Sequence, residues 1–475
     1  MAKLSADQML DASLVDVAAR IAAREITSVE LTEAALARVQ EQQPRINAFV
    51  RIDRERALEQ ARAADAALAA GRKPGLLHGV PLAHKDMYYE AGQVTTCGSR
   101  VRGEFVPQAT SALIERLAAA GAVTLGALNM AEFALGPTGH NVIKGHCRNP
   151  WNTDHITCGS SSGSGAAVAA RLAFGSLGSD TGGSVRLPAA ANGVVGMKPT
   201  YSRLSRANSM ALSVSIDTPG PLARTARDCA RLFGIVAGHD PADPTSSRRA
   251  LADYEAASQM GIAGLRVGVP ENFFFDHVTA DVGAAMQVAL GTLEKLGARL
   301  VSLRVPAPEP LTELSRVVVY AEAAAIHSAW LRERGELYSP QVRSRAATGL
   351  AIPASAYLEA LHLRPQLLRE FVEGVFTHCD VLFSPTLSIP VPTLAETDVG
   401  GGAGMWSIIS KLVHCTAPFN YLGLPAISVP AGFTANGLPA SLQLAGRPFS
   451  EARLFRVAGA YQGATDWHLR APARG

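Results

Sequence analysis

The sequence predicts an α/β fold in one large domain. Short apolar runs bounded by Gly and Pro alternate with helical patterns from about residue 75 to residue 200, and again over 264–306. This alternation is typical of α/β proteins, whereas α+β proteins keep strands and helices in separate stretches. The 475 residues suffice for one large domain or two to three ordinary ones. Because no internal repeat or low-complexity linker divides the chain, we expect a single domain over residues 1–475.

The first part of the chain is expected to be helical. Apolar residues recur at helical spacing within 5–70, and Thr27 or Ser28 is a suitable N-cap before Glu30. A core region over 75–220 follows, in which short strands alternate with helices. The elements expected there are a strand and loop over 75–92, an amphipathic helix over 110–121, a buried strand over 122–128 and an Ala-rich helix over 166–173.

The second part of the chain is expected to add one more β-α-β unit and a helical region. That unit comprises a strand over 264–270, a helix over 281–296 and a strand over 300–306. Residues 310–376 are mainly helical in pattern and form a variable region of the domain. The remaining expected elements are a strand over 381–387, a flexible crossing over 396–405, two paired strands over 425–433 and 441–448, and a helix over 451–465.

Composition and charge exclude several classes of protein. The net charge is only +3 and no long run of Lys or Arg occurs, which argues against nucleic-acid or membrane binding. No apolar stretch is long enough to cross a bilayer, and the N-terminus has no uninterrupted apolar segment typical of a signal peptide. The 6 cysteines show no zinc-like spacing. We therefore expect reduced, buried thiols in a cytoplasmic protein.

Residues 158–199 contain two clusters of Ser and Gly between segments that read as core elements. A flexible linker would not lie between such elements. One interpretation is a G-x-S-x-G elbow with Ser161 as nucleophile, but that motif needs a strong preceding strand, which 151–157 is not. Its histidine could only come from later in the chain. The candidates are His277, His362, His378 and His414.

Two further interpretations concern the second cluster. Asp180-Thr181-Gly182 resembles an aspartic-protease loop, but that chemistry needs two carboxylates and the sequence has no second copy. Amide cleavage needs instead a nucleophile, a proton acceptor and donors for the oxyanion. The small residues from Thr181 to Ser184 have N–H groups that can converge on one point. We favour this interpretation, with Lys85 completing the site.

The segment GSDTGGSVRLPAAANGVVGMKPT, residues 178–200, closely resembles the core motif of the amidase signature family. Segments GVPLAHKD, NMAEFALG and TAPFNYLGLPAISVP fit the same family, and the similarity thins only between about 240 and 375. The resemblance implies one α/β domain with a twisted mixed sheet of about eleven strands and helices on both faces. It implies no metal or organic cofactor, and many relatives are homodimers.

The resemblance also assigns roles to individual residues. It implies Ser184 as nucleophile, Ser160 as proton carrier after a cis peptide bond from Gly159, and Lys85 as base. The oxyanion hole would comprise Thr181, Gly182 and Gly183, with the N–H of Ser184. The acyl pocket would include Phe133, Ala134 and Leu135. We read Asp180 and Arg186 as scaffold, and Trp406 and Tyr421 as residues of the variable substrate region or of the core.

Lys85 must be neutral to accept a proton, whereas the reference pKa of lysine is about 10.4. Burial beside hydroxyls, away from carboxylates, would depress it. We therefore expect a site without counter-ions and a rate that rises toward alkaline pH. Asp86 follows Lys85 on the expected strand and should point to the opposite face. His84 is interpreted as a packed or hydrogen-bonded core residue.

The substrate is expected to be a small, neutral aryl or alkyl amide. Related carbamates (urethanes) and urea-type compounds are alternatives, and so is an inactive relative that serves as a scaffold. The main rival is the glutaminase A subunit of the tRNA-dependent amidotransferase. Such glutaminases carry Gln after the signature arginine and an acid that holds the amino group of glutamine. Here Leu187 and Val413 stand at those two places. An acid-binding pocket remains open as an alternative, with three candidates, Arg332, Arg334 and Arg343.

Overall fold

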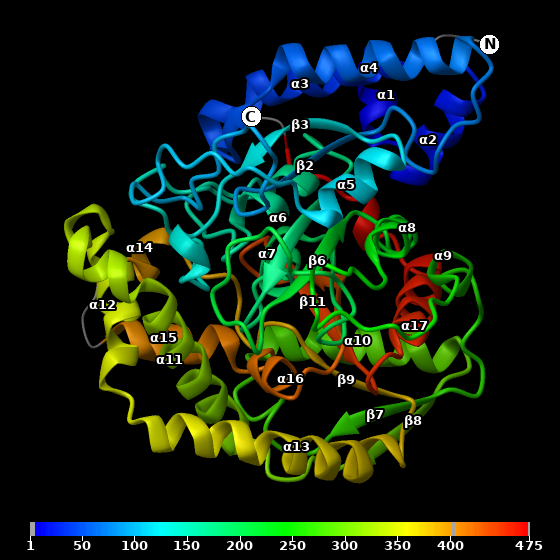
Figure 1. The fold of residues 1–475 in the computed structure, drawn as a ribbon. Helices are drawn as coiled ribbons and strands as arrows, with labels where there is room; N and C mark the ends of the chain where they lie inside the picture. Colours follow the sequence, from blue (N-terminus) through cyan, green and yellow to red (C-terminus); the bar gives the residue numbers. More distant parts are fainter. Residues whose placement is uncertain (1–4, 401–403, 474–475) are drawn as a thin grey trace.

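The computed structural model describes residues 5–400 and 404–473 and has an α/β architecture (Figure 1). The described residues contain eleven strands, the number expected, and hydrogen bonding divides them into a sheet of eight and a sheet of three. Both sheets are mixed. Helices cover the sheets on both sides, so the expected single α/β domain is confirmed.

The large sheet has the strand order β4-β6-β5-β10-β11-β9-β7-β8. Strand β7 pairs parallel with β8 and β9, whereas the other neighbours pair antiparallel. The expected pairing of the two late strands is confirmed in β10 and β11. The bounds are β4 Gly175–Asp180, β5 Val195–Lys198, β6 Thr218–Ala223, β7 Arg266–Pro270, β8 Arg299–Leu303, β9 Val381–Pro385, β10 Ala426–Phe433 and β11 Pro439–Ala445.

The small sheet carries the catalytic-lysine candidate. It comprises β1 (Phe49–Ile52), β3 (Val123–Leu128) and β2 (Pro81–Lys85), in that order. Strand β2 runs parallel to β3 and all five of its residues are buried. A strand buried on both faces is typical of parallel pairing under helices. Lys85 is its last residue and therefore points into the interior of the molecule.

Four helices at the N-terminus lie together at the top of Figure 1. They are α1 (Ala6–Asp11), α2 (Leu14–Ala22), α3 (Ser28–Ile46) and α4 (Arg54–Ala69). The expected cap is confirmed, because the Thr27 hydroxyl accepts from Glu30 N and the Glu30 carboxylate accepts from Thr27 N. This capping box satisfies two donors at the helix start.

The helix after the first serine cluster begins earlier than the sequence predicts. Helix α6 spans Ser162–Ala169 rather than 166–173, so the serine cluster itself forms its first turn. Helix propensity disfavours Ser and Gly there. Packing overrides it, because a Cβ on Gly163 would lie 2.4 Å from Ala48 O and 2.6 Å from Asn129 N. The small residues are what allow this helix to approach the neighbouring backbone.

The remaining helices cover the large sheet and form one side of the molecule. Residues 310–376 are helical as expected and lie at the left and bottom of Figure 1. Of the crossing expected at 396–405, residues 401–403 lie outside the described residues. Among the described residues, no helix has the length and apolar character needed to span a bilayer. The bounds are α5 Ala112–Ala119, α7 Arg186–Asn192, α8 Ala226–Val236, α9 Tyr254–Ala257, α10 Ala280–Lys295, α11 Glu309–Glu333, α12 Pro340–Thr348, α13 Ala354–Phe376, α14 Leu394–Thr397, α15 Gly404–Val413, α16 Ala417–Tyr421 and α17 Glu451–Gly463.

Candidate active site

Lys85 lies between two serine hydroxyls at the junction of the two sheets. Its Nζ is 2.7 Å from Ser160 Oγ and 2.8 Å from Ser179 Oγ, and its side chain is 1% exposed. Asp86, the next residue, points elsewhere as expected, since its carboxylate accepts a hydrogen bond from Thr96 N at 3.2 Å. The nearest hydrogen-bonding partners of the amine are therefore neutral, as the sequence predicts.

Burial lowers the pKa of Lys85 to about 7, while the negative charges of Asp217 and Asp180 oppose that fall. The expectation of a site without counter-ions was therefore wrong in part. Two buried carboxylates lie near the amine, although neither is hydrogen-bonded to it. The net result is a lysine that is substantially neutral near neutral pH, which a base requires.

Ser160 is the serine of a cis peptide, and Ser161 is not equivalent to it. The bond between Gly159 and Ser160 is cis, in agreement with the resemblance. The Ser161 hydroxyl lies 3.3 Å from both the carbonyl oxygen and the amide nitrogen of Ser179, and the residue is fully buried. That hydroxyl holds β4 in place and has no access to substrate, which argues against the G-x-S-x-G elbow.

Ser184 lies in the turn between β4 and α7 and lines a cavity. Its carbonyl oxygen accepts a hydrogen bond from Ser161 N at 3.3 Å, which places it beside the cis peptide. Within the described residues its hydroxyl makes no hydrogen bond, and Ser160 Oγ bonds to Lys85 instead. The structure thus brings Lys85 and Ser160 into contact, and places Ser184, which lines the cavity, against the backbone of the residue after Ser160.

The turn from Thr181 to Ser184 is fixed by the Asp180 carboxylate. Gly183 N donates to Asp180 Oδ1 at 2.8 Å, so the N–H of Gly183, expected in the oxyanion hole, is already engaged. Gly183 has a φ of +133°, and a Cβ there would lie 2.4 Å from Thr416 Oγ1. Only glycine suits such a position. Gly182 is open to the cavity, with nothing within 4 Å of where its Cβ would be.

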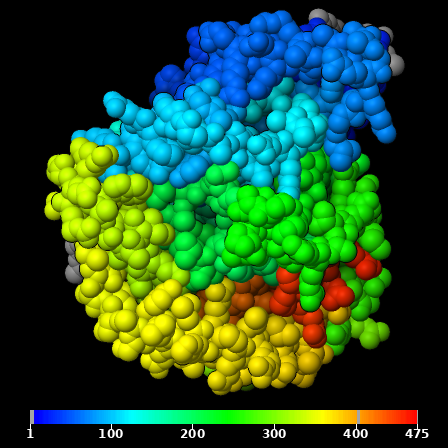
Figure 2. Space-filling view, viewed as in Figure 1, coloured from blue at the N-terminus to red at the C-terminus, as the bar shows by residue number. Residues whose placement is uncertain are grey.

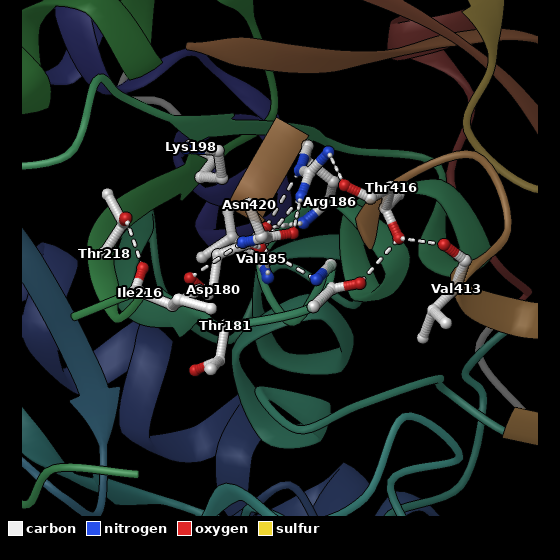
Figure 3. A network of polar contacts seen from close by, with 12 residues as sticks. Asp180, Thr181, Val185, Arg186, Lys198, Ile216, Thr218, Val413, Thr416 and Asn420 are labelled. Atoms are coloured by element: carbon white, nitrogen blue, oxygen red, sulfur yellow. Dashed lines mark hydrogen bonds and ion pairs between the residues drawn. The ribbon is translucent and has the colours of Figure 1, made fainter. Parts of the chain in front are cut away.

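Asp180 and Arg186 form a fully buried ion pair that organises this turn (Figure 3). The two side chains approach to 2.9 Å, and Arg186 also donates to Gln443 Oε1 and to Asn420 Oδ1, at 2.7 Å and 2.6 Å. Burial alone would raise the pKa of Asp180, but the charge of Arg186 and its hydrogen bonds lower it to about 2. A permanently ionised, paired carboxylate cannot act as an aspartic-protease acid, so the scaffold interpretation fits.

Asp217 is a member of the site that sequence reasoning missed. It accepts from the Thr181 hydroxyl at 2.6 Å and from the N–H groups of Leu212 and Ser213 at 2.7 Å and 2.9 Å. Burial raises the pKa of its carboxyl, against the effect of these hydrogen bonds. Asp217 therefore ties the loop before β6 to the first residue of the catalytic turn. No local motif marks this aspartate in the sequence.

The cavity in front of Ser184 has a volume of about 90 Å³. Ala134 and Leu135 line it as expected, together with Thr181 and Gly182. Phe133 does not line it; its ring packs behind the loop against His327 and Trp330, with centroids 4.5 Å and 5.6 Å apart. The expected acyl-pocket loop is thus in place, but its aromatic residue supports the wall rather than forming it.

The variable helices supply charged groups to the cavity. Arg345 on α12 lines it, is 4% exposed, and donates to Leu135 O at 2.7 Å and to Tyr320 Oη at 3.1 Å. Its Nε has no hydrogen-bond partner among the described residues. Glu313 and Arg316 of α11 also line the cavity and pair with one another. The cavity arginines therefore differ from the three that the sequence suggested.

Other candidates prove structural. His84 is buried, its Nδ1 accepts from Leu177 N at 3.2 Å, and burial lowers its pKa to about 4. Tyr421 donates to Ala360 O from within the core, and Trp406 packs against Tyr320 with centroids 5.3 Å apart. The part of the chain that the structure describes holds no group of three His, Cys, Asp or Glu placed to bind a metal.

Comparison with known sequences places this geometry in a family. The amidase family model matches residues 30–455. The A subunit of glutamyl-tRNA(Gln) amidotransferase from Azotobacter vinelandii is 40% identical over 483 residues, covering 97% of this chain and 99% of that protein. Its counterpart from Aromatoleum aromaticum is 41% identical over 493 residues, covering 98% of this chain and 99% of that protein.

Solved structures with a similar fold lead to the same family. A chain of a vestigial complex that reveals the origins of an s-triazine catabolic enzyme has a TM-score of 0.89 at 34% identity, covering 95% of this chain and 98% of that chain. Peptide amidase from Stenotrophomonas maltophilia has a TM-score of 0.82 at 30% identity, covering 95% and 96%.

This fold, with a buried lysine bonded to the serine of a cis peptide, defines a class of enzymes that act on carbon–nitrogen bonds. The chain belongs to the amidase family.

Proposed function

We propose that this protein is an amidohydrolase that cleaves a small amide through an acyl-enzyme on Ser184. The observation that carries the proposal is the hydrogen bond between Ser160 and the amine of Lys85, whose pKa is depressed, beside a serine that lines a cavity. Neutral Lys85 accepts a proton from Ser160, which takes one from Ser184 as that oxygen attacks the carbonyl carbon. In this scheme Ser184 must turn about its Cα–Cβ bond, from one staggered position to another, to bring its hydroxyl to Ser160.

The proton then leaves with the amine. The tetrahedral intermediate collapses, the C–N bond breaks, and Lys85 returns the proton through Ser160 to the departing nitrogen. Water then attacks the acyl carbon while one of its protons passes through Ser160 to Lys85. The bond to the Ser184 oxygen breaks, Lys85 returns the proton through Ser160 to that oxygen, and the acid is released. In this scheme the N–H groups of Thr181, Gly182 and Ser184 donate to the oxyanion. The N–H of Gly183 is left out because it already donates to Asp180. Each such donor is typically worth about 3 kcal/mol in the transition state.

The cavity favours a neutral or anionic substrate over a cationic one. Arg345 and Arg316 contribute two positive charges and Glu313 one negative charge, already paired with Arg316. Val413 lines the wall where the resemblance places an acid in the amidotransferase glutaminases. An α-ammonium would meet no free carboxylate there, whereas a substrate carboxylate would be attracted by the charges of Arg345 and Arg316.

A second candidate is the glutaminase component of an amidotransferase, and the relatives favour it. The curated relatives named above belong to glutamyl-tRNA(Gln) amidotransferases and are 40% and 41% identical over nearly the whole chain. In that case the ammonia released would pass to a partner protein. Both candidates share the cleavage of an amide C–N bond at Ser184. They differ in whether the substrate is glutamine.

Glutamine and glutarate monoamide, which lacks only the amino group, separate the two candidates. We expect the purified chain alone to release ammonia from the monoamide with a higher kcat/KM than from glutamine. The substitution Val413→Asp should shift the ratio toward glutamine, with Val413→Asn as the matched neutral control. A preference for glutamine, or activity only when the other components of an amidotransferase are added, would establish the second candidate instead. Anilides and carbamates in the same assay define the range of leaving groups.

A further inference from the structure

A groove outside the catalytic cavity collects positive charge. It lies between the loop around residues 99–105 and the C-terminal end of α11, and its volume is about 820 Å³. We call it the cationic groove and define it by its charged and aromatic residues. These are Arg100, Arg102, Glu104, Phe105, Lys144, Trp330 and Arg334. Figure 2 shows the light-blue surface around residue 100 lying against the yellow-green surface of the 330–340 region.

The cations of the groove make no close contact with carboxylates in the described residues, although the charge of Glu132 acts on Arg100 from a longer range. In the residues that the structure describes, none of them forms an ion pair, and the groove contains one glutamate. Arg102 is the sharpest case because it is only 7% exposed and its Nε and Nη2 have no hydrogen-bond partner. Its guanidinium lies 3.5 Å from the centroid of the Phe105 ring. A buried charge is normally paired with an opposite charge. Within the described residues, Arg102 is surrounded instead by aromatic rings and by the Met210 sulfur, 3.6 Å from its Nη1, with no carboxylate in contact.

The segments that line the groove continue into exposed apolar residues, which we call its apolar rim. Val94, Phe105, Val106 and Val142 are 37%, 36%, 40% and 61% exposed. Val94 and Phe105 come from adjacent segments, since Thr95 N donates to Phe105 O at 2.9 Å, and Val142 precedes Lys144 by two residues. Exposed apolar side chains gathered beside arginines and a tryptophan are typical of a protein-binding surface. A site for a small anion needs no such rim.

We infer that the cationic groove docks an acidic, partly apolar segment of a partner protein. Carboxylates of that segment would neutralise the exposed guanidinium groups of Arg100 and Arg334, and its apolar side chains would pack on the exposed valines. A single-stranded nucleic acid fits less well, because the chain carries a net charge of only +3. The two aromatic rings of the groove are also engaged already, Phe105 by Arg102 and Trp330 by Phe133, whereas base stacking needs free ring faces. Trp330 lines the groove and its ring also packs on Phe133, so the docked segment would adjoin the wall of the catalytic cavity.

The test is binding of a fluorescein-labelled peptide of alternating glutamate and leucine to the full chain, followed by fluorescence anisotropy. We expect saturable binding that weakens with added salt. The double variant Arg100→Gln, Arg334→Gln should weaken it about ten-fold. The matched double variant Lys295→Gln, Arg299→Gln removes two exposed cations from α10 and β8 and should leave it unchanged. Thermal unfolding of both variants at the wild-type temperature verifies that they are folded.

Four outcomes would overturn the inference. The first is no binding of the peptide, and the second is equal binding of its glutamine counterpart. The third is an equal loss of affinity in the control double variant, which would show that the peptide responds to the net charge of the protein and not to the groove. The fourth is displacement of the peptide by inorganic phosphate or a single-stranded oligoribonucleotide that itself binds more tightly through the groove arginines. Phosphate would then indicate a small-anion site, and the oligoribonucleotide a nucleic-acid surface.

Discussion

Ser160 and Ser161 carry the same hydroxyl on consecutive residues, yet their surroundings assign them different tasks. Ser160 Oγ contacts Lys85 Nζ at 2.7 Å, whereas Ser161 Oγ contacts the backbone of Ser179 at 3.3 Å. Ser160→Ala should lower kcat/KM by more than about 10³-fold because it interrupts the proton route. Ser161→Ala, the matched control, should cost only about 1 kcal/mol of stability. Amide hydrolysis and chemical unfolding of both variants check this.

The contrary result is equally clear. If Ser161→Ala abolished hydrolysis while Ser160→Ala retained it, the elbow interpretation would replace the relay. Ser184→Ala belongs to the same series and should lower activity at least as much as Ser160→Ala, since it removes the nucleophile itself.

In the proposed mechanism, Lys85 sets the pH dependence of the reaction. Burial lowers its pKa to about 7, and only the neutral amine accepts a proton. The fraction of neutral Lys85 therefore grows as the pH rises through about 7, and kcat/KM should rise with it and then level off. Hydrolysis of a neutral amide between about pH 5 and pH 9 measures this, because such a substrate does not titrate there. A profile that is flat or falls across this range would contradict Lys85 as the base.

At the scale of elements, the turn between β4 and α7 depends on one buried ion pair. Asp180 binds Arg186, Asn420 and the N–H groups of Gly183 and Val185. Asp180→Asn should lower the free energy of unfolding by about 3–5 kcal/mol, since it leaves Arg186 without a counter-charge in the interior. The exposed pair of Asp466 and Arg470, at 3.5 Å, offers a control. Asp466→Asn should cost less than about 0.5 kcal/mol.

The ion pair of Asp180 and Arg186 also makes the stability of the fold depend on pH. The pKa of Asp180 is lowered from 3.8 to about 2 in the folded protein. A carboxylate with a depressed pKa stabilises the fold above the pKa of the unfolded chain, and that stabilisation is lost as the pH falls through about 2. Acid unfolding of the Asp180→Asn variant should therefore lack this contribution. Urea unfolding at several acidic pH values measures the difference, and identical pH curves for variant and wild type would contradict it.

The elements that the sequence predicted well are those with a local signal. The N-cap before Glu30, a strand within 75–92 and the pairing of β10 with β11 are all encoded in short segments, although the strand ends at Lys85 and leaves Asp86 outside it. The predicted start of α6 was wrong because the helix begins where Gly163 packs closely against Ala48 and Asn129, two residues that are distant in sequence. Local patterns contain no information about such contacts.

The candidate site divides in the same way. Lys85, Ser160 and Ser184 were assigned through the resemblance to the amidase signature family. The structure brings Lys85 and Ser160 into contact and places Ser184 against Ser161. Asp217 and Arg345 carry no motif and enter the site only through long-range contacts, to Thr181 and to Leu135. From the sequence one can predict only that some arginine of this arginine-rich helical region faces the cavity. Which one does depends on how α12 packs against the loop at 133–135.

At the scale of the whole molecule, the catalytic contacts join the two sheets. Lys85 ends β2 of the small sheet, whereas Ser179 lies on β4 of the large one, and their side chains meet at 2.8 Å. Neither sheet contains the site alone. The fold must therefore hold both sheets in register for Lys85 to reach the serines. A substitution that destabilises the packing far from the site should therefore lower the fraction of folded molecules and leave kcat per folded molecule unchanged.

The C-terminal helix tests this separation of packing from chemistry. Helix α17 crosses the segment after α9 so closely that a Cβ on Gly459 would lie 1.8 Å from Ser258 O. Gly459→Ala should therefore lower the free energy of unfolding by about 3 kcal/mol, since backbone must move to admit the methyl group. Gly463→Ala, at the end of the same helix, meets nothing within 4 Å and should stabilise by about 0.5 kcal/mol.

Both substitutions lie outside the catalytic cavity, so kcat per folded molecule should equal that of the wild type in each variant. Urea unfolding followed by circular dichroism gives the stabilities, and single-temperature kinetics well below the transition gives kcat. Equal stability of the two variants would show that the contact between α17 and Ser258 relaxes at no cost. A lower kcat in the Gly459→Ala variant, in a fully folded sample, would show instead that α17 packing transmits to the relay across the large sheet.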